Sequence, residues 1–418
     1  MDPGAPQPRR SKATRHRLTL PLMNMNTFIR PAPFYVFAIS LALLSVSLTR
    51  APMMFDEGFY VTAARDFLAA QPTSNAQHPP LAKYFIAASI RIFGDRPFGW
   101  RFPSTLAGAL AAACVFGITR QLTHNQRTAT IAWLLTVAGG FWFVMSRIAC
   151  LSIYEFAFEL AGVWLFLIAL GNPAGQTVNA GITKSSTSTK SSLTLFTLAG
   201  VLFGFSVGCR WCGIVGLIAC VIVAVIERVQ LRPIVSMLAA ALVTYLAIWV
   251  PLFIRERRPL AEIVSANLYV YRFHHYAPAD PRLGEPWWTW IFRLEPKQSL
   301  AHLVANPVIG SLGLFAVVAL LVNRFLLHKR GYCYILSLLY LGHLGQWVVG
   351  VRPQTFYYYY FEAFTILAPT LAVAMQRLEW RGLRADIVVT AASLLFFLYW
   401  YPTWANLPQP FNTLTGPH

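Results

Sequence analysis

The feature that most constrains this chain is a series of apolar segments, each about as long as a membrane span. A helix needs about 20 residues to cross the hydrocarbon core of a bilayer. We therefore predict an all-α polytopic integral membrane protein with about 11 transmembrane helices. The segments lie near residues 33-50, 102-120, 128-146, 148-170, 193-208, 212-227, 233-254, 306-326, 331-350, 358-376 and 385-402.

Composition supports this interpretation. Hydrophobic residues make up 56% of the 418 positions and charged residues only 12%, which is too little polar surface to cover a soluble globule of this size. A net charge of +18 would suggest nucleic-acid binding in a soluble domain. No module of basic and aromatic residues accompanies that charge, and much of the Lys and Arg lies in short segments between apolar runs. We expect no nucleic-acid partner and interpret the basic residues mainly as a topology signal.

The distribution of Lys and Arg also predicts orientation and domain boundaries. With a cytoplasmic N-terminus, every second loop is basic, as the excess of cytoplasmic Lys and Arg requires. We interpret the first apolar run as an uncleaved anchor, because no small-residue cleavage site precedes "RAPMMFDE". The expected parts are a basic cytoplasmic tail (1-32), a catalytic transmembrane module (33-254) with a first outer loop (51-101), an outer loop with amphipathic and aromatic segments (255-305), C-terminal transmembrane helices (306-402) and an outer tail (403-418).

The loops on the predicted outer side carry the unusual chemistry. Asp56 and Glu57 form an adjacent carboxylate pair in "MMFDEGFY", directly after the first apolar run. An arginine at the end of a span commonly extends to the membrane interface, and each one alone has that interpretation. Several guanidinium groups beside a carboxylate pair would instead suit a phosphate, whose oxygens match the arginine fork. The arginines at or near span boundaries are Arg101, Arg147, Arg210 and Arg352.

A lipid-linked sugar would use both kinds of group. A polyprenyl-phosphate sugar presents its phosphate at the membrane rim, and a carboxylate there could deprotonate an acceptor hydroxyl that attacks the anomeric carbon. The departing phosphate is already an anion held by arginine, so no general acid is needed. Asp56 fits the base, while Glu57 could orient a helix end, an arginine or a divalent cation. The alternative is that the pair only caps a helix beginning near Gly58.

Other candidate metal ligands are weaker. The six cysteines are scattered, and only Cys209 and Cys212 form a CxxC pair, without a second pair or nearby histidines to complete a zinc site. His274 and His275 are adjacent in the long outer loop, and adjacent residues seldom chelate one ion without a third donor. We assign no metal site to either pair.

Several motifs give the chain a family resemblance. "FDEGFY", "HPPLAKYF", "GWRFPS", "SRIACLSIYEFAF", "CRWCG", "PWWTW" and "VRPQTFYYYY" occur in the order and spacing seen in the protein O-mannosyltransferases, glycosyltransferase family 39, of the GT-C fold. The resemblance extends from about residue 55 to 373. It implies an inverting hexosyltransferase that moves mannose or another hexose from a dolichyl- or polyprenyl-phosphate donor to a hydroxyl, such as a protein Ser or Thr.

The resemblance also assigns roles by position. Asp56 is similar to the catalytic base of the family and Glu57 to its companion, while Arg352 resembles the last-loop residue that contacts the lipid phosphate. Arg210 and Trp211 stand where relatives have Lys-Trp. We expect Asp56 and Glu57 to be catalytic, and the donor phosphate or substrate to be bound by His78, Arg101, Arg147, Arg210, Trp211, Arg352 and Tyr357. Tyr357 begins a run of four tyrosines that could equally form an interfacial aromatic belt.

Two departures from the family pattern leave questions open. Ser152 occupies a position that is commonly Asp, and Glu155 and Glu159 lie one and two turns deeper on the same predicted helix. An intramembrane Glu is a candidate functional residue, although it could also bond a neighbouring helix.

The second departure is a long outer loop with no room for the β-trefoil domain of eukaryotic relatives. This suggests a bacterial-type enzyme of the plasma membrane with a periplasmic active site. The acceptor could be protein, or a lipid or glycolipid as in the related aminoarabinose transferases. A multi-pass transporter is a more remote alternative. A transporter would place ionisable residues near the midplane of paired repeats, whereas most charges of this chain lie at one rim and the sequence has no evident internal repeat.

Overall fold

The computed structural model describes residues 32-406, apart from residues 55, 172-185, 277-283, 292, 294-302, 330, 350, 351, 353 and 378-383, and apart from the side chains of 186-191. The residues described from Pro33 onward belong to one compact unit. The predicted N-terminal tail, residues 172-185 of the predicted catalytic module, part of the 255-305 loop and most of the outer tail lie outside the described residues.

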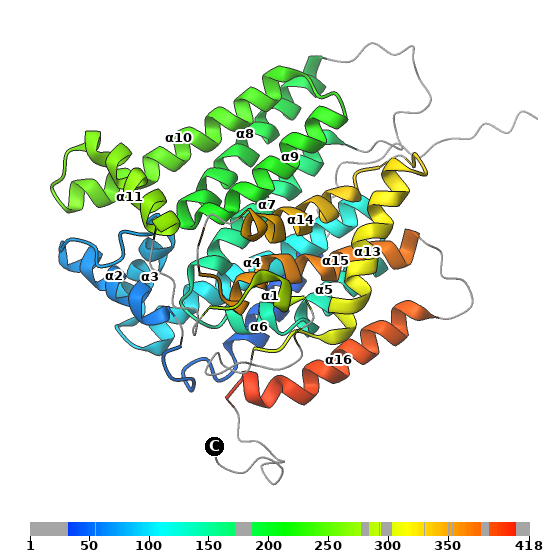
Figure 1. The fold of residues 1–418 in the computed structure, drawn as a ribbon, viewed down its shortest axis with the longest axis horizontal. Coiled ribbons are helices and arrows are strands. Elements are labelled where there is room, and N and C mark those ends of the chain that lie inside the picture. The colour runs from blue at the N-terminus through cyan, green and yellow to red at the C-terminus, as the bar shows by residue number, and fades with distance from the viewer. Residues whose placement is uncertain are drawn as a thin grey trace, which may run out of the picture. The chain divides into compact units, whose positions relative to one another are not determined.

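Helices account for all the regular structure of the described residues, and no strand occurs among them (Figure 1). Each of the eleven predicted apolar segments contains a helix or a pair of helices, so the all-α prediction is confirmed. These helices are α1 (Ala32–Ser45), α4 (Pro97–Thr123), α5 (Gln126–Ala138) with α6 (Phe141–Met145), α7 (Leu151–Leu170), α8 (Ser186–Cys209), η3 (Trp211–Gly213) with α9 (Ile214–Ile226), α10 (Leu231–Arg255), α13 (Pro307–Phe325), α14 (Tyr334–Val348), η5 (Tyr357–Tyr360) with α15 (Phe361–Arg377), and α16 (Ala385–Trp404).

The number of spans is less certain than the fold class. Among the described residues, 6 helices are long and apolar enough to cross a membrane: α4, α7, α10, α13, α16 and the part of α8 from residue 192. Two further apolar helical stretches, Ala32–Ser45 and Trp211–Ile226, are shorter. The protein is a multi-pass integral membrane protein, and the predicted total of eleven spans is not confirmed.

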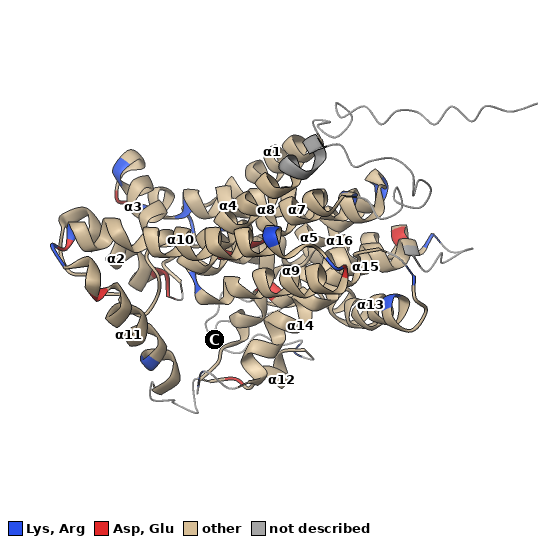
Figure 2. Cartoon of the chain, turned by 90° about the horizontal axis from the view of Figure 1, so that it is seen from above, with Lys and Arg blue, Asp and Glu red and all other residues tan. Residues whose placement is uncertain are grey.

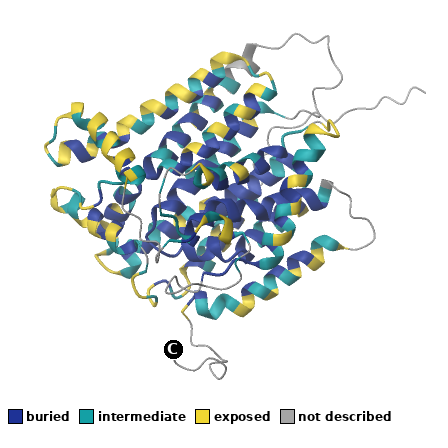
Figure 3. Cartoon of the chain, in the orientation of Figure 1, coloured by how far each residue is buried: buried dark blue, intermediate teal, exposed yellow. Residues whose placement is uncertain are grey.

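Burial separates central from peripheral helices. In α4, 72% of the most apolar 18-residue stretch is buried, against 33% of the corresponding stretch in α10 and 28% in α13 and α16. The peripheral helices expose large apolar side chains such as Leu242 on α10 and Phe315 on α13 (Figure 3). Such surfaces would be unfavourable in water but match lipid tails, and helices satisfy their backbone groups internally. Figure 2 shows charged residues gathered around α2, α3 and α11 at one edge and near the far end of α13, with few along the helices between them.

Glycines allow the central helices to pack closely. Gly200 on α8 faces the backbone of Met237 on α10, where an added Cβ would lie 2.9 Å from the Met237 Cα atom. Gly117 on α4 faces the indole of Trp164 on α7, where a Cβ would lie 2.7 Å from the ring atom Cδ2. Small residues at such crossings permit the close approach on which helix association in lipid depends.

Shorter helices form the loops predicted to be outside. The first loop contains α2 (Glu57–Ala69) and α3 (Leu81–Phe93), and the second contains η4 (Leu260–Glu262), α11 (Ile263–Tyr276) and α12 (Trp287–Trp290). A cluster of buried side chains joins the two loops: Trp249, Leu252 and Phe253 of α10 with Val270 of α11, against which Phe67 and Tyr84 of the first loop pack. Hydrogen bonds also join the two loops. The Arg255 side chain donates to the carbonyl oxygen of Phe67, which lies 188 residues earlier in the chain.

Candidate functional site

Asp56 precedes the first turn of α2, but its side chain does not cap the helix. It occupies the N-cap position without a side-chain capping hydrogen bond. Its Oδ2 atom instead accepts hydrogen bonds from the hydroxyls of Tyr358 (2.7 Å) and Tyr60 (3.3 Å). A capping carboxylate would accept from the free backbone N–H groups of the first turn. The capping alternative therefore does not describe Asp56, whose half-buried carboxylate is held by one phenol of the same helix and one from a distant segment.

Glu57 has a different environment from its neighbour. The side chain is fully buried and forms a bidentate ion pair with Arg101, at 2.8 Å to Nε and 2.7 Å to Nη2. It also accepts from the backbone N–H groups of Met54 (3.1 Å) and Ala149 (2.9 Å). These contacts join the start of α2 to α4 and to the segment before α7. Glu57 thus positions the turn that carries Asp56, and its oxygens face protein groups.

Arg101 is occupied by the protein itself. Besides its two bonds to Glu57, it donates to three carbonyl oxygens, so all five of its N–H groups have protein acceptors. Its side chain has no exposed surface. We therefore leave Arg101 out of the anion site in which the sequence placed it. The three carbonyls belong to Leu48 (3.0 Å), Ala51 (2.9 Å) and Pro52 (2.7 Å).

Arg147 also contacts the segment between α1 and α2. Its Nη1 atom donates to the carbonyls of Leu44 and Val46, each at 2.6 Å. Its guanidinium lies 4.9 Å from the ring centroid of Phe143. A cation at the carbonyl end of a helix offsets the negative end of the helix dipole, which is the role this geometry gives Arg147 at α1. The structure therefore places Arg147, like Arg101, as a support for the segment that leads to Asp56.

The two other predicted arginines converge on one aromatic ring. The guanidinium carbons of Arg210 and Arg352 lie 5.0 Å and 5.2 Å from the ring centroid of Tyr359. Tyr359 follows Tyr358, the residue that donates to Asp56. Two cations from loops far apart in the sequence therefore lie on the same side of the molecule as the candidate base. This is the arrangement required of an anion site beside a general base.

Arg210 is oriented by two further contacts. Its Nη1 atom donates to Ser152 Oγ (2.8 Å) at the start of α7 and to Glu362 Oε1 (2.7 Å) at the start of α15. Both arginine and carboxylate are almost fully buried. A buried ion pair of this kind fixes the direction of the guanidinium, and removal of one partner leaves an uncompensated charge. Ser152 is thus a hydroxyl partner of Arg210.

Two histidines complete this side of the site. The rings of His78 and His274 lie 4.9 Å apart, and His274 Nε2 is 2.9 Å from the carbonyl oxygen of Gln77. Burial, His274, Lys83 and the two arginines lower the pKa of His78 well below its usual value. Burial and then Arg352 lower the pKa of His274 to about 4. Both imidazoles are therefore neutral near pH 7, because the surrounding charge is positive and disfavours another cation.

The sequence did not assign His274, Tyr60, Tyr358 or Tyr359 to the site. The run of four tyrosines was noticed in the sequence, but nothing in it indicated that Tyr358 is the tyrosine that bonds Asp56. Tyr357, which was predicted, is buried against Phe141 (ring centroids 5.1 Å apart), and its hydroxyl accepts from the N–H of Ala305 (3.3 Å). The structure does not bring Tyr357 to the carboxylate.

Trp211 lies beside the polar site rather than in it. Its Nε1 atom donates to the hydroxyl of Tyr245 (2.9 Å). The indole lines an apolar cavity of about 380 Å³ together with residues of α8, α9, α10 and α11. Ile214 and Leu242 line the same cavity and are exposed at the surface of the helices. Trp211 is therefore placed to contact hydrocarbon rather than phosphate.

A second cavity lies between the two loops. Its volume is about 300 Å³, and its lining includes His78, Lys83, Ser265 and Tyr269. The Nζ atom of Lys83 donates to the carbonyls of Asn75 (2.5 Å) and His78 (2.9 Å), which fixes the loop before α3. His78 thus connects this cavity to the neighbourhood of Asp56, since its ring lies 5.9 Å from that of Tyr60.

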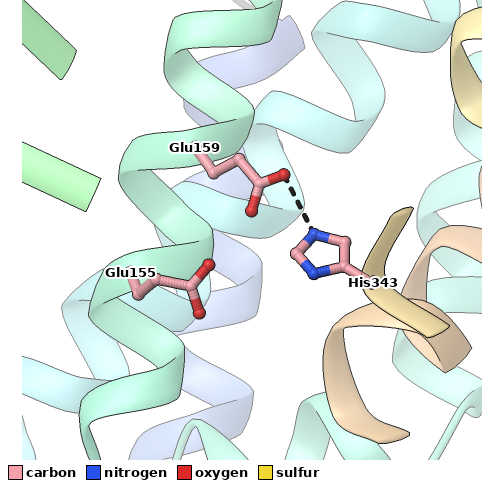
Figure 4. A group of neighbouring side chains, drawn as sticks. All are labelled: Glu155, Glu159 and His343. Atoms are coloured by element: carbon pink, nitrogen blue, oxygen red, sulfur yellow. Dashed lines mark hydrogen bonds and ion pairs between the residues drawn. The ribbon is translucent and has the colours of Figure 1, made fainter. Parts of the chain in front are cut away.

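One further polar group lies deeper among the helices. Glu155 and Glu159 of α7 and His343 of α14 are buried, and Figure 4 shows both carboxylates directed toward the imidazole. Glu159 Oε1 lies 2.9 Å from His343 Nε2. One ligand atom from each residue lies within 4.8 Å of the others, which makes this a possible metal site. None of the three residues bonds to Asp56, and Arg210 contacts the same helix α7 nearer its start, through Ser152.

The sequence of the first half of the chain resembles known proteins. Residues 77–254 match the family model described as dolichyl-phosphate-mannose-protein mannosyltransferase. A polyprenol-phosphate-mannose–protein mannosyltransferase of Corynebacterium glutamicum is 30% identical over 136 residues, which are 30% of this chain and 26% of the relative. One from Mycolicibacterium smegmatis is 28% identical over 142 residues, which are 33% of this chain and 28% of the relative. The aligned part thus spans about a quarter of these relatives' length.

Solved structures extend the similarity to most of the chain. The Saccharomyces cerevisiae protein O-mannosyltransferase Pmt1–Pmt2 complex bound to the sugar donor matches with a TM-score of 0.73 and 10% identity, covering 91% of this chain and 91% of that chain. ArnT from Cupriavidus metallidurans bound to undecaprenyl phosphate matches with a TM-score of 0.61 and 17% identity, covering 91% of this chain and 66% of that chain. At these identities the matches show a common fold.

Proposed function

We propose that this chain, which has the GT-C fold, is a member of the protein O-mannosyltransferase family and transfers mannose or another hexose from a polyprenyl-phosphate donor to a hydroxyl. The acceptor we favour is a Ser or Thr side chain of a protein, and the site of the reaction is the outer face of a bacterial plasma membrane. The names of the curated relatives support the donor and the acceptor, and the geometry around Asp56 supports the reaction type.

The observation that carries the proposal is the position of Asp56. Its carboxylate makes no capping hydrogen bond to the helix it precedes and accepts instead from the hydroxyls of Tyr358 and Tyr60. The two phenolic hydroxyls fix the orientation of the carboxylate, and a general base must be held within hydrogen-bond reach of the proton that it takes. It then takes the proton of the acceptor hydroxyl as the oxygen attacks the anomeric carbon, and the bond from that carbon to the phosphate oxygen breaks. Attack opposite the leaving phosphate inverts the configuration.

The donor is held by its two chemically different ends. Arg210 and Arg352 bind the phosphate and stabilise the charge that it keeps as the leaving group. The apolar cavity beside Trp211 takes the first isoprenoid units, and its exposed wall at Ile214 and Leu242 lets the rest of the chain remain in lipid. The acceptor approaches through the cavity between the loops, past His78.

The test uses purified protein in liposomes with radiolabelled polyprenyl-phosphate mannose and a membrane extract as acceptor. Asp56→Asn keeps the size of the side chain but cannot take a proton, and loss of a general base typically reduces the rate by about 10² to 10⁴. Asp66→Asn is the matched control, because Asp66 is on the same helix and accepts from the backbone N–H of Ser74 (2.8 Å). Near-normal transfer by Asp56→Asn would refute the mechanism.

The destination of the label separates the two acceptors. Label recovered in protein supports a protein mannosyltransferase. Label recovered in a lipid fraction supports a glycosyltransferase of the aminoarabinose-transferase type, which the fold match to ArnT keeps as the second candidate.

A further inference from the structure

The buried cluster of Glu155, Glu159 and His343 has no part in the transfer reaction described above. Glu155 and Glu159 are four residues apart on α7, so their side chains share one face of the helix. His343 comes from α14, 184 residues later in the chain than Glu159. The three side chains are at most 1% exposed. Polar groups this deeply buried are normally paired.

Most of the cluster's polar atoms lack a partner. Within the part of the chain that the structure describes, both oxygens of Glu155, Oε2 of Glu159 and Nδ1 of His343 accept or donate no hydrogen bond. The single internal contact is the 2.9 Å bond from His343 Nε2 to Glu159 Oε1. Figure 4 shows that the unpaired carboxylate of Glu155 is directed toward His343 and not away from the cluster. An unpaired buried carboxylate is strongly unfavourable, so the group has to be either protonated or compensated by a positive charge.

The nearest cation does not supply that charge. Arg210 forms its ion pair with Glu362 at 2.7 Å, and neither oxygen of Glu155 has a hydrogen-bond partner among the described residues. A proton on His343 would balance one of the two glutamates and leave the other. A divalent cation would balance both carboxylates while the imidazole stays neutral, as a metal ligand must be.

We propose that Glu155, Glu159 and His343 bind one divalent metal ion of the zinc class. Two carboxylates and one imidazole form a set that zinc accepts as three protein ligands, with a fourth position left open. Imidazole favours zinc over magnesium and calcium, which prefer oxygen ligands alone. One donor atom of each residue already lies within 4.8 Å of the others, so small side-chain movements would complete the coordination.

Helix α9 faces the cluster and leaves room for the Glu159 side chain. Gly216 on α9 lies against the side chain of Glu159, where an added Cβ would be 2.7 Å from Oε1 and 2.9 Å from Cδ. Any larger residue there would displace the carboxylate. The ion would therefore join α7 and α14 beside α9, below Arg210, and would stabilise this part of the helix bundle. This inference does not depend on the transfer reaction.

The experiment measures metal binding by the full chain in detergent. The protein is stripped with a chelator and dialysed against buffered Zn²⁺, and its metal content and zinc affinity are determined by mass spectrometry and indicator competition. We expect one equivalent of zinc in the wild-type protein. Loss of residues that merely support a metal ligand typically costs 10- to 100-fold in affinity, so Glu155→Gln and His343→Gln should each cost more than about 100-fold.

Two further variants separate ligand loss from general damage. Glu227→Gln removes a carboxylate that is bonded to Arg324 (2.8 Å) and Tyr334 (3.0 Å) outside the cluster, and it should keep one equivalent. Gly216→Ala keeps all three ligands but displaces Glu159, and it should weaken zinc binding. Zinc should raise the melting temperature of the wild-type and Glu227→Gln proteins and not that of Glu155→Gln.

Two results would overturn the proposal. Less than one equivalent at saturating zinc would show that the carboxylates are neutralised by protons. Equal binding by the wild-type protein and Glu155→Gln would show that zinc occupies another site, such as exposed histidines. Neither measurement depends on sugar transfer. A negative result for the metal site is therefore distinguishable from a negative result for the proposed transferase function.

Discussion

Removal of the Arg101 charge should destabilise the protein without acting on the donor site directly. Arg101→Gln abolishes the bidentate pair with Glu57 and the bonds to the carbonyls of Leu48, Ala51 and Pro52. Because neither Arg101 nor Glu57 has exposed side-chain surface, the variant leaves an uncompensated carboxylate in the interior. Breaking a buried ion pair by removing one partner typically costs about 3–5 kcal/mol.

The matched control is an exposed pair in the same loop. Arg65 and Asp95 form a bidentate pair at 2.8 Å and 3.0 Å, but their side chains are 43% and 45% exposed. Exposed pairs contribute about 0–1 kcal/mol, so Arg65→Gln should hardly change stability. The double variant Arg101→Met/Glu57→Gln removes both buried charges and should recover part of the loss.

The assay is thermal unfolding of the detergent-purified variants, combined with titration of each folded variant with the polyprenyl-phosphate donor. We expect the melting temperature to fall in the order wild type, Arg65→Gln, double variant, Arg101→Gln. A wild-type melting temperature for Arg101→Gln together with lost donor affinity would refute the positioning role. It would return Arg101 to the phosphate site that the sequence alone suggested.

Three further predictions concern the site itself. Arg352→Gln should lower donor affinity by about 2–3 kcal/mol while leaving the melting temperature unchanged, because a charged hydrogen bond to a buried anion is lost; unchanged affinity in the same titration would remove Arg352 from the site. Tyr358→Phe removes the 2.7 Å bond to Asp56 and should slow transfer by about fivefold with unchanged donor affinity, corresponding to about 1 kcal/mol, whereas an unaltered rate would contradict its orienting role. His274 has a pKa of about 4 in the folded protein against about 6.5 in the unfolded chain, so between these pH values the unfolded chain binds more protons and the free energy of unfolding falls as pH falls, by about 3 kcal/mol at most. His274→Gln should therefore reduce the dependence of the melting temperature on pH in that range. An equally steep pH dependence in the variant would contradict the assignment.

The sequence by itself determined the fold class, since hydropathy is a property of local segments. Lipid requires every backbone polar group to be satisfied within the segment, so each long apolar run has to form a helix. All eleven runs contain helix, and the ordered motifs indicated a family resemblance before any packing was known. Asp56 was also accessible to sequence reasoning, because a carboxylate pair at the end of an apolar run is unusual in itself.

The tertiary structure decided which arginines serve which purpose. Four arginines at span boundaries are equivalent in sequence, because each has the same charge and a similar position. The difference lies in the acceptors that surround them in the fold. Arg101 and Arg147 meet free carbonyls between residues 44 and 52, whereas Arg210 and Arg352 meet the face of Tyr359.

The cluster of Glu155, Glu159 and His343 shows the same division. Helical periodicity places the two glutamates on one face of α7, and the sequence marked them as candidates because they are carboxylates within a predicted membrane span. Nothing local indicates His343, which lies in an ordinary apolar helix. Only the packing of α14 against the helices around α7 brings its imidazole to within 2.9 Å of Glu159. A site built from distant segments depends on contacts whose partners are chosen by the whole fold, and local sequence patterns do not encode that choice.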